Sequence, residues 1–130
     1  PVSRKSFPKQ FAPLVGDESL FQASARRLSG ARFGAPLVMT NADFRFIVAE
    51  QLDQIGIAPS AILIEPSGRN TAPAILAAAL TVARTDPEGL LLVAPSDHVV
   101  PDAEAFGRAV ELGAPAAQMM ARHRHPWARE

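Results

Sequence analysis

Short apolar runs alternate along the chain with stretches in which apolar residues recur at helical spacing. The continuous apolar character of buried strands marks three runs, at 36–39, 61–64 and 90–94. Helical spacing follows each of these runs, over 44–55, 71–85 and 102–112. Strands that alternate with helices in this way predict βαβ crossovers, a mainly parallel sheet and a three-layer, Rossmann-like α/β fold.

A further helix is predicted before the first of these strands. Ser19 and Gln22 match a capping box at its start. Apolar residues share one helical face over 20–28, and Gly30 is a typical helix end. The chain therefore opens with a loop and a helix, whereas a doubly wound sheet begins with a strand. We expect an incomplete sheet that lacks its first strand.

The C-terminal end of the chain departs from this pattern. Asp102 can cap a last helix, but the helical period fails from Gly113 onward. We therefore expect one partial domain over 1–112. It would be followed over 113–130 by an aperiodic tail that is not part of the fold.

Composition narrows the classes of partner and location. Thirteen basic residues balance thirteen acidic ones, which removes the electrostatic argument for a nucleic-acid or membrane partner. The chain has no cysteine, so disulfides and thiolate chemistry are excluded. The longest apolar run, 72–82, is shorter than the roughly 20 residues that span a bilayer, and no signal peptide is visible. A cytoplasmic location is expected, although the chain begins at Pro1 rather than at a methionine.

Three polar groups are predicted to meet at the carboxyl edge of the sheet. They are the basic loop 4–10, the loop 65–71 that leads into a helix, and Asp97, which follows the strand predicted at 90–94. Ligands bind at this edge in open α/β sheets, and a helix N-terminus favours an anion. A cation, a helix N-terminus and a carboxylate together suggest a nucleotide with its metal. The sequence contains neither a Walker A motif nor a G-x-G-x-x-G motif.

The residues themselves are more specific than their spacing. Four motifs occur in order: Pro8-Lys9-Gln10-Phe11, Ser19-Leu20-Phe21-Gln22, Glu65-Pro66-Ser67-Gly68-Arg69-Asn70-Thr71-Ala72-Pro73-Ala74 and Pro95-Ser96-Asp97-His98. Over roughly residues 1–112 the chain resembles the bacterial mannose-1-phosphate guanylyltransferases, or GDP-mannose pyrophosphorylases. The resemblance is to the type whose catalytic domain is often fused to a mannose-6-phosphate isomerase domain, and it implies the nucleotide-diphospho-sugar transferase fold.

The resemblance implies transfer of GMP from GTP to mannose 1-phosphate, which gives GDP-mannose and pyrophosphate. It places Lys9 against the phosphates as the catalytic cation, and Asp97 as the ligand of Mg²⁺. The nucleotide-binding residues it implies are Glu65, Asn70, Thr71 and Ala72. An ionised Glu65 could accept hydrogen bonds from the two adjacent donors of guanine, N1–H and the 2-amino group, which adenine lacks.

Other interpretations of the same residues stay open. Lys9 alone could be solvated, Asp97 could form an Asx turn, and Glu65, like Asn70 and Thr71, could only cap local structure. The family's Gly-rich loop and its sugar-binding half are both missing, so we expect the 130 residues alone to be inactive and marginally stable. The alternatives are a non-catalytic nucleotide-binding remnant, or a transferase for another sugar or base.

Overall fold

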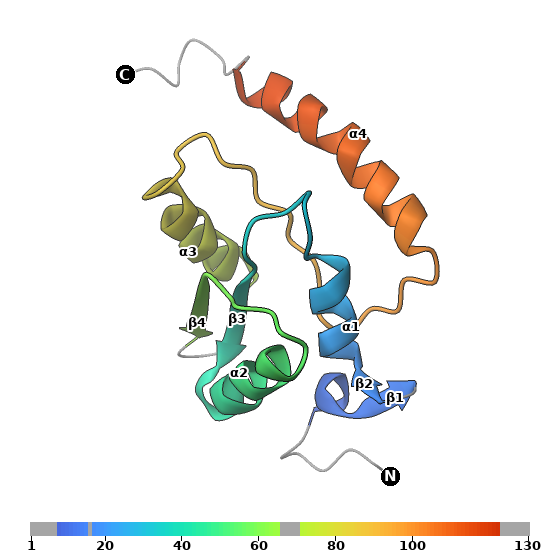
Figure 1. Cartoon of the computed structure of the whole chain (residues 1–130). Coiled ribbons are helices and arrows are strands. Elements are labelled where there is room, and N and C mark those ends of the chain that lie inside the picture. Colours follow the sequence, from blue (N-terminus) through green and yellow to red (C-terminus); the bar gives the residue numbers. More distant parts are fainter. Residues whose placement is uncertain (1–7, 16, 66–70, 123–130) are drawn as a thin grey trace.

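The computed structural model describes residues 8–15, 17–65 and 71–122 (Figure 1). Short 3-10 helices and strands flank the longer helices along this part of the chain. In chain order the elements are η1 (Lys9–Phe11), β1 (Pro13–Val15), β2 (Glu18–Ser19), α1 (Leu20–Arg27), β3 (Leu37–Asn41), η2 (Ala42–Phe44), α2 (Arg45–Gln54), β4 (Ala61–Glu65), α3 (Thr71–Ala83) and α4 (Ala103–Arg122).

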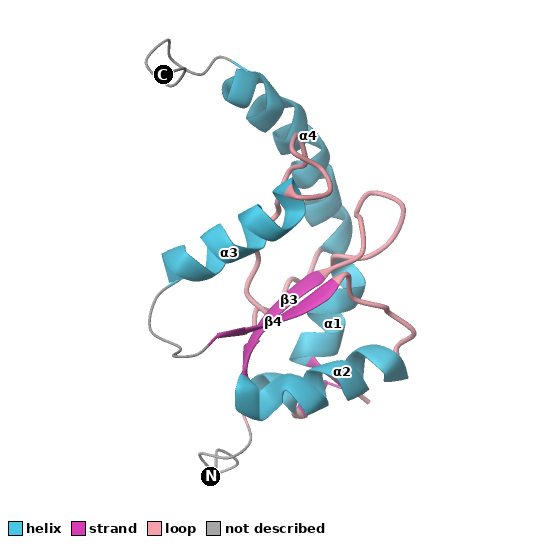
Figure 2. Cartoon of the chain, turned by 90° about the vertical axis from the view of Figure 1, so that its left-hand side faces the viewer, coloured by secondary structure: helices cyan, strands magenta, loops and turns pink. Residues whose placement is uncertain are grey.

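The central pair of strands is parallel, with α2 as the crossover between them. β3 and β4 pair in register from Leu37 opposite Ala61 to Asn41 opposite Glu65. α3 lies on one side of this pair, and α1 and α2 lie on the other (Figure 2). The predicted α/β fold with parallel strands is therefore confirmed.

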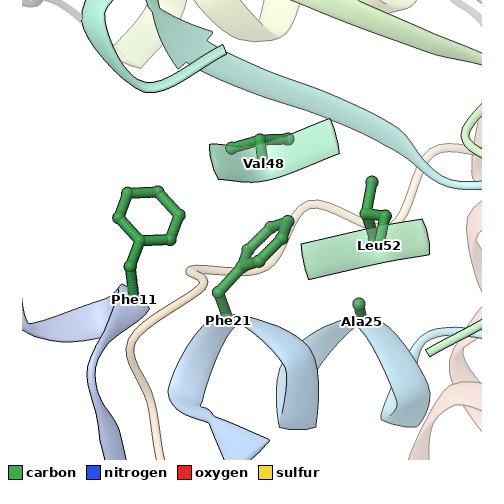
Figure 3. Packing of buried hydrophobic residues seen from close by; sticks show 5 residues of the cluster. All are labelled: Phe11, Phe21, Ala25, Val48 and Leu52. Atoms are coloured by element: carbon green, nitrogen blue, oxygen red, sulfur yellow. The ribbon is translucent and has the colours of Figure 1, made fainter. Parts of the chain in front are cut away.

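The core lies between α1, α2 and the sheet. Phe11, Phe21, Ala25, Val48 and Leu52 form one buried cluster, to which η1, α1 and α2 all contribute (Figure 3). The rings of Phe11 and Phe21 meet edge to face with centroids 5.6 Å apart, a favoured aromatic geometry. The short segment around Phe11 is thereby fixed to the helices by burial.

Helix α1 begins as its sequence predicts. The hydroxyl oxygen of Ser19 accepts a hydrogen bond from the Gln22 amide at 3.1 Å, and the Gln22 side-chain oxygen accepts one from the Ser19 amide at 3.0 Å. This reciprocal pair is the predicted capping box, and it satisfies two amides that a helix start leaves open. The N-terminal residues before it hold a 3-10 turn and a two-stranded hairpin, β1 with β2, instead of loop alone.

The strand predicted at residues 90–94 is wrong. These residues have no regular secondary structure, and Leu90 and Val93 are 43% and 55% exposed. Among the described residues the parallel sheet holds β3 and β4 alone. A strand needs a neighbour for its backbone groups, and a cavity separates this segment from β3, so apolar composition alone does not make it a strand.

The end predicted for the last helix is also wrong. α4 continues through Gly113 and Pro115 to Arg122, and it curves in Figure 2. Residues after Gly113 are rich in alanine and methionine, which favour helix even where no apolar period shows. The prolyl ring removes one backbone hydrogen bond and is a known cause of such bending. The domain boundary near residue 112 stays a prediction.

No helix in the described ranges combines the length and the apolar character needed to cross a bilayer.

Candidate nucleotide-binding site

The carboxyl ends of β3 and β4 bring Asn41 and Glu65 to one edge of the sheet. The two residues are partners in the parallel register, and each is the last residue of its strand. Glu65 is half-buried, and the Asn41 side-chain oxygen accepts a hydrogen bond from the Phe44 amide at 3.2 Å. Sequence reasoning missed Asn41 as a site candidate, although a polar residue at a strand's carboxyl end is the same signal that identified Glu65.

Helix α3 begins six residues after Glu65. Thr71 is its first residue, Ala72 its second, and both are exposed. The first turn carries no acidic side chain, so the positive end of the helix dipole is not neutralised locally. Asn70 lies outside the described residues, so its predicted role stays a prediction.

A cavity of about 380 Å³ joins the start of α3 to the segment that precedes Asp97. Thr71 and Ser96 are both among its lining residues. Thr71, from the predicted loop 65–71, and Ser96, the neighbour of Asp97, therefore line the same cavity, whereas Glu65 and Asp97 themselves are not among its lining residues. Most of the remaining lining is apolar and comes from α1, β3 and α3.

Asp97, the predicted metal ligand, lies on an exposed segment next to His98. Its side chain is 62% exposed, and its carboxylate lies 4.0 Å from the imidazole of His98, which is 70% exposed. The described residues hold no group of three or more histidine, aspartate or glutamate side chains that could bind a metal unaided. A hard cation held by one carboxylate would take its other ligands from phosphate and water, so the role of Asp97 as a metal ligand stays a prediction.

Lys9 is exposed on η1, and backbone hydrogen bonds and the burial of Phe11 fix the turn that carries it. The Phe11 amide donates to the Pro8 carbonyl and the Ala12 amide donates to the Lys9 carbonyl, both at 3.1 Å. Phe11 itself is in the core. The ammonium group therefore projects from a short turn whose backbone is anchored, which suits a mobile charge on a fixed base.

A buried network of polar side chains provides a second anchor for this turn. The Gln51 side-chain amide donates to the Phe11 carbonyl at 2.9 Å, and the Ser19 hydroxyl donates to the Gln51 side-chain oxygen at 2.7 Å. The Gln22 side-chain amide donates to the Gln51 carbonyl at 3.1 Å and to the Gln54 side chain at 3.0 Å. Ser19, Gln22 and Gln51 are all buried. The network ties η1, α1 and α2 together beneath Lys9.

Sequence reasoning found only part of this network. Ser19 and Gln22 were identified as a capping box, whereas Gln51 was not singled out. Its signal is its position, because Gln51 lies three residues after Val48 and next to Leu52, on the buried side of α2. A polar residue at a core position of an amphipathic helix requires a partner.

The chain matches one protein family over nearly its whole length. The family model described as nucleotidyl transferase matches residues 1–128. The chain belongs to the nucleotidyl transferase family. Enzymes of this kind generally use a divalent metal.

Relatives of this chain include proteins of polysaccharide biosynthesis and a mannose-1-phosphate guanylyltransferase. The xanthan biosynthesis protein XanB of Xanthomonas campestris pv. campestris is 54% identical over 118 residues, which cover 91% of this chain and 25% of XanB. The alginate biosynthesis protein AlgA of Pseudomonas aeruginosa is 48% identical over 118 residues, 91% of this chain and 24% of AlgA. A mannose-1-phosphate guanylyltransferase of Escherichia coli is 47% identical over 120 residues, 91% of this chain and 25% of that enzyme. The predicted resemblance is confirmed, and the chain spans about a quarter of the length of these relatives.

A solved structure supports the same fold. The crystal structure of mannose-6-phosphate isomerase from Helicobacter pylori matches with a TM-score of 0.75 and 34% identity, over 89% of this chain and 44% of that chain. That protein is named as an isomerase, whereas the family model matched here describes a transferase. The pairing agrees with the predicted resemblance to transferases that are often fused to an isomerase.

Proposed function

We propose that this chain forms the nucleotide-binding part of a mannose-1-phosphate guanylyltransferase. In this reaction a phosphate oxygen of mannose 1-phosphate forms a bond to the α-phosphorus of GTP. The bond from that phosphorus to the bridging oxygen breaks, and pyrophosphate leaves with the electron pair. The name and 47% identity of the Escherichia coli relative support this choice of reaction.

One observation carries the proposal: β4 ends at Glu65, and α3 begins six residues later at Thr71 beside the same cavity as Ser96. A base held at Glu65 would place its ribose and phosphates toward the start of α3. The Glu65 carboxylate accepts hydrogen bonds from the guanine N1–H and 2-amino groups. Adenine would leave that charge without donors, so ATP is disfavoured.

The charged reactants need compensation, because two phosphate-bearing molecules repel each other. Lys9 lies on its anchored turn and provides a positive charge to the phosphates. The Asp97 carboxylate would hold Mg²⁺ together with phosphate oxygens and water. When bound, Mg²⁺ neutralises charge that develops on the phosphates.

Calorimetric titration of the 130-residue chain tests the base-selecting role of Glu65. GTP and ATP are titrated separately at a fixed Mg²⁺ concentration. Glu65→Gln keeps the shape but loses the charge, and we expect it to reduce the preference for GTP by about 10- to 100-fold, the range of one or two lost charge-assisted hydrogen bonds. Glu50→Gln, at an exposed position of α2, is the control and should leave the preference unchanged. Equal preference in the wild type and Glu65→Gln would contradict the assignment.

The proposed roles of Lys9 at the phosphates and of Asp97 at the metal are tested separately, by comparing GTP with guanosine and by adding or omitting Mg²⁺. Lys9→Ala should weaken binding of GTP but not of guanosine, while the exposed control Arg84→Ala affects neither. Asp97→Asn should weaken GTP binding only when Mg²⁺ is present. Loss of guanosine binding in Lys9→Ala would show that the turn acts through the fold and not through the phosphates.

The reaction is measured on the natural polypeptide that carries these residues, as pyrophosphate release from GTP. Release should require mannose 1-phosphate, and glucose 1-phosphate serves as the control for another sugar. Equal release with both sugar phosphates would contradict the proposed sugar, and equal release from ATP would contradict the proposed base.

A further inference from the structure

Gln51 is a polar side chain at a core position of α2. It is 9% exposed and lies in the sequence between Val48 and Leu52, which are each 1% exposed. A polar group in such a place is tolerated only when its hydrogen bonds are made. An apolar side chain of similar volume would fill the same space without that requirement. The role of Gln51 therefore lies in the groups that it binds.

The Gln51 side chain holds one peptide group of the N-terminal turn. Its amide nitrogen donates to the Phe11 carbonyl at 2.9 Å. The Phe11 carbonyl and the Ala12 amide belong to the same planar peptide group. The Ala12 amide donates in turn to the Lys9 carbonyl at 3.1 Å, which closes η1. One rigid group therefore links Gln51 on α2 to the backbone of Lys9.

The aromatic contacts of Phe11 do not fix this peptide group by themselves. The Phe11 ring centroid lies 5.6 Å from that of Phe21 and 5.5 Å from that of Phe44, which holds the side chain in the core. Rotation about the backbone bonds of Phe11 can still reorient the peptide group while the ring stays buried. A 3-10 helix of three residues resists such rotation poorly, because a single turn makes few hydrogen bonds for the residues it orders. The hydrogen bond from Gln51 supplies this constraint.

Ser19 decides which end of the Gln51 amide faces the turn. The Ser19 hydroxyl oxygen accepts from the Gln22 amide, and the hydroxyl donates its proton to the Gln51 side-chain oxygen at 2.7 Å. The Gln51 amide nitrogen is thereby directed to the Phe11 carbonyl. The reversed amide would place two oxygens together with no proton between them. The network thus presents a donor, and not an acceptor, to the turn.

We infer that Gln51 is a positioning residue of the nucleotidyl transfer reaction, acting on Lys9 through the peptide group between Phe11 and Ala12. This inference rests on the proposed function, in which Lys9 faces the phosphates of GTP. The Lys9 ammonium sits at the end of a flexible four-carbon stem, so the protein sets its mean position through the backbone that carries it. Displacement of such a group by about 1 Å is enough to weaken its action on a reacting phosphate. Because Gln51 is buried, it affects the reaction through Lys9 and not by contact with the substrate.

The first test compares GTP with guanosine, because only GTP carries the phosphates. Both ligands are titrated by calorimetry against the 130-residue chain at a fixed Mg²⁺ concentration, and the ratio of the two affinities is recorded. Gln51→Leu keeps a good helix former in α2 and removes the donor to the turn. We expect it to lower the ratio by about 3- to 10-fold, as part of the loss that Lys9→Ala causes.

Two more variants show whether the effect passes through Lys9. In the background of Lys9→Ala, adding Gln51→Leu should leave the ratio unchanged, because the charge that Gln51 positions is gone. Ser19→Ala leaves the Gln51 amide free to reverse, so it is a milder variant and should lower the ratio in the same direction. Far-UV circular dichroism shows whether each variant is folded at the temperature of the titration.

Two controls separate positioning from a general loss of stability. Leu52→Ala is expected to destabilise the core about as much as Gln51→Leu. Figure 3 shows Leu52 on the far side of Phe21 from Phe11. Gln54→Leu alters the exposed end of the same network. Neither residue bonds to the peptide group of the turn, so both variants should keep the wild-type ratio of affinities.

The second test follows the turn itself and needs no nucleotide. Amide hydrogen exchange is measured by NMR at Ala12 and, as an internal reference, over 48–50 of α2. Gln51→Leu should speed exchange at Ala12 by at least about tenfold more than in α2, because the peptide group that carries this amide loses its anchor. Leu52→Ala should speed exchange at both places by a similar factor, since it lowers stability without releasing the turn.

An unchanged affinity ratio in Gln51→Leu would overturn the inference, as would an equal fall in Leu52→Ala. A further fall when Gln51→Leu is added to Lys9→Ala would also overturn it, because the effect would not pass through Lys9. Failure of the wild type to bind GTP, or an unchanged ratio in Lys9→Ala, would instead contradict the proposed function. Exchange then decides on Gln51: selective acceleration at Ala12 supports it as the anchor of the turn, and equal acceleration at both places rejects it.

Discussion

The buried network around Gln51 makes a strong quantitative prediction. Gln51→Leu keeps roughly the same side-chain volume but removes the acceptor of the Ser19 hydroxyl and the donor to the Phe11 carbonyl, bonds of 2.7 and 2.9 Å. Ser19 is 2% exposed and Phe11 is 4% exposed, so water is kept from the groups that lose their partner. The hydrogen bond from Gln22 to the Gln51 backbone carbonyl is unaffected by the substitution.

The expected loss follows from the two hydrogen bonds that are broken. Breaking a buried hydrogen bond costs about 1–3 kcal/mol, and the leucine recovers part of this by being apolar. We expect Gln51→Leu to lower the free energy of unfolding by about 2–4 kcal/mol. Gln54→Leu is the matched control on the same helix. Gln54 is exposed, and the Gln22 amide keeps its bond to the Gln51 carbonyl, so the loss should stay below about 1 kcal/mol.

The assay is urea unfolding followed by far-UV circular dichroism. The single tryptophan, Trp127, lies outside the described residues, so its fluorescence is not a suitable reporter of this core. A double-mutant cycle with Ser19→Ala isolates the direct bond, and we expect a coupling energy of about 1 kcal/mol between the two positions. If Gln51→Leu is no more destabilising than Gln54→Leu, the network does not stabilise the fold as argued.

Three further substitutions, one of them with a control, test the core, the corrected helix and the turn after α2 by the same unfolding assay. Leu52→Ala should cost about 2–5 kcal/mol because Leu52 is 1% exposed, whereas Leu80→Ala, at a position 60% exposed, should cost much less; equal costs would place the core elsewhere. Gly113→Ala should raise stability by about 0.5–1 kcal/mol, because Gly113 lies inside α4 and an added Cβ would meet no atom within 4 Å; no gain or a loss would argue against helix at this point. Gly56→Ala should lower stability by about 1 kcal/mol, because Gly56 has φ +69° although the space around it is equally open; a gain would contradict this backbone conformation.

Local sequence signals predicted the elements whose cause is local. The capping box at Ser19 and Gln22 and the helix cap at Asp102 formed as predicted, because they join backbone and side-chain groups within three or four residues. The strands 37–41 and 61–65 formed because each finds the other as its parallel neighbour. The carboxyl edge that carries Glu65 followed directly from that arrangement.

Two errors at the sequence level have opposite causes. Residues 90–94 have strand composition, but pairing depends on a neighbour that composition cannot supply. Residues 113–122 have no clear apolar period, but helix propensity and continuity with the preceding turns carry the helix past Pro115 to Arg122. A strand was predicted at 90–94 although no neighbouring strand in the described part of the chain is there to pair with it. A helix was not predicted at 113–122, although a helix forms its backbone hydrogen bonds within itself and needs no neighbour.

The sequence by itself determined the alternation of strand and helix, the capping signals and the four motifs that identify the family. Only the tertiary structure decided that Gln51 meets Ser19 and Phe11, 32 and 40 residues away in the chain. It also decided that Thr71 and Ser96 line one cavity together with residues 37–39 of β3. The reason is physical: local hydrogen bonds depend on nearby residues, whereas burial and strand pairing depend on which distant surfaces are available to be covered.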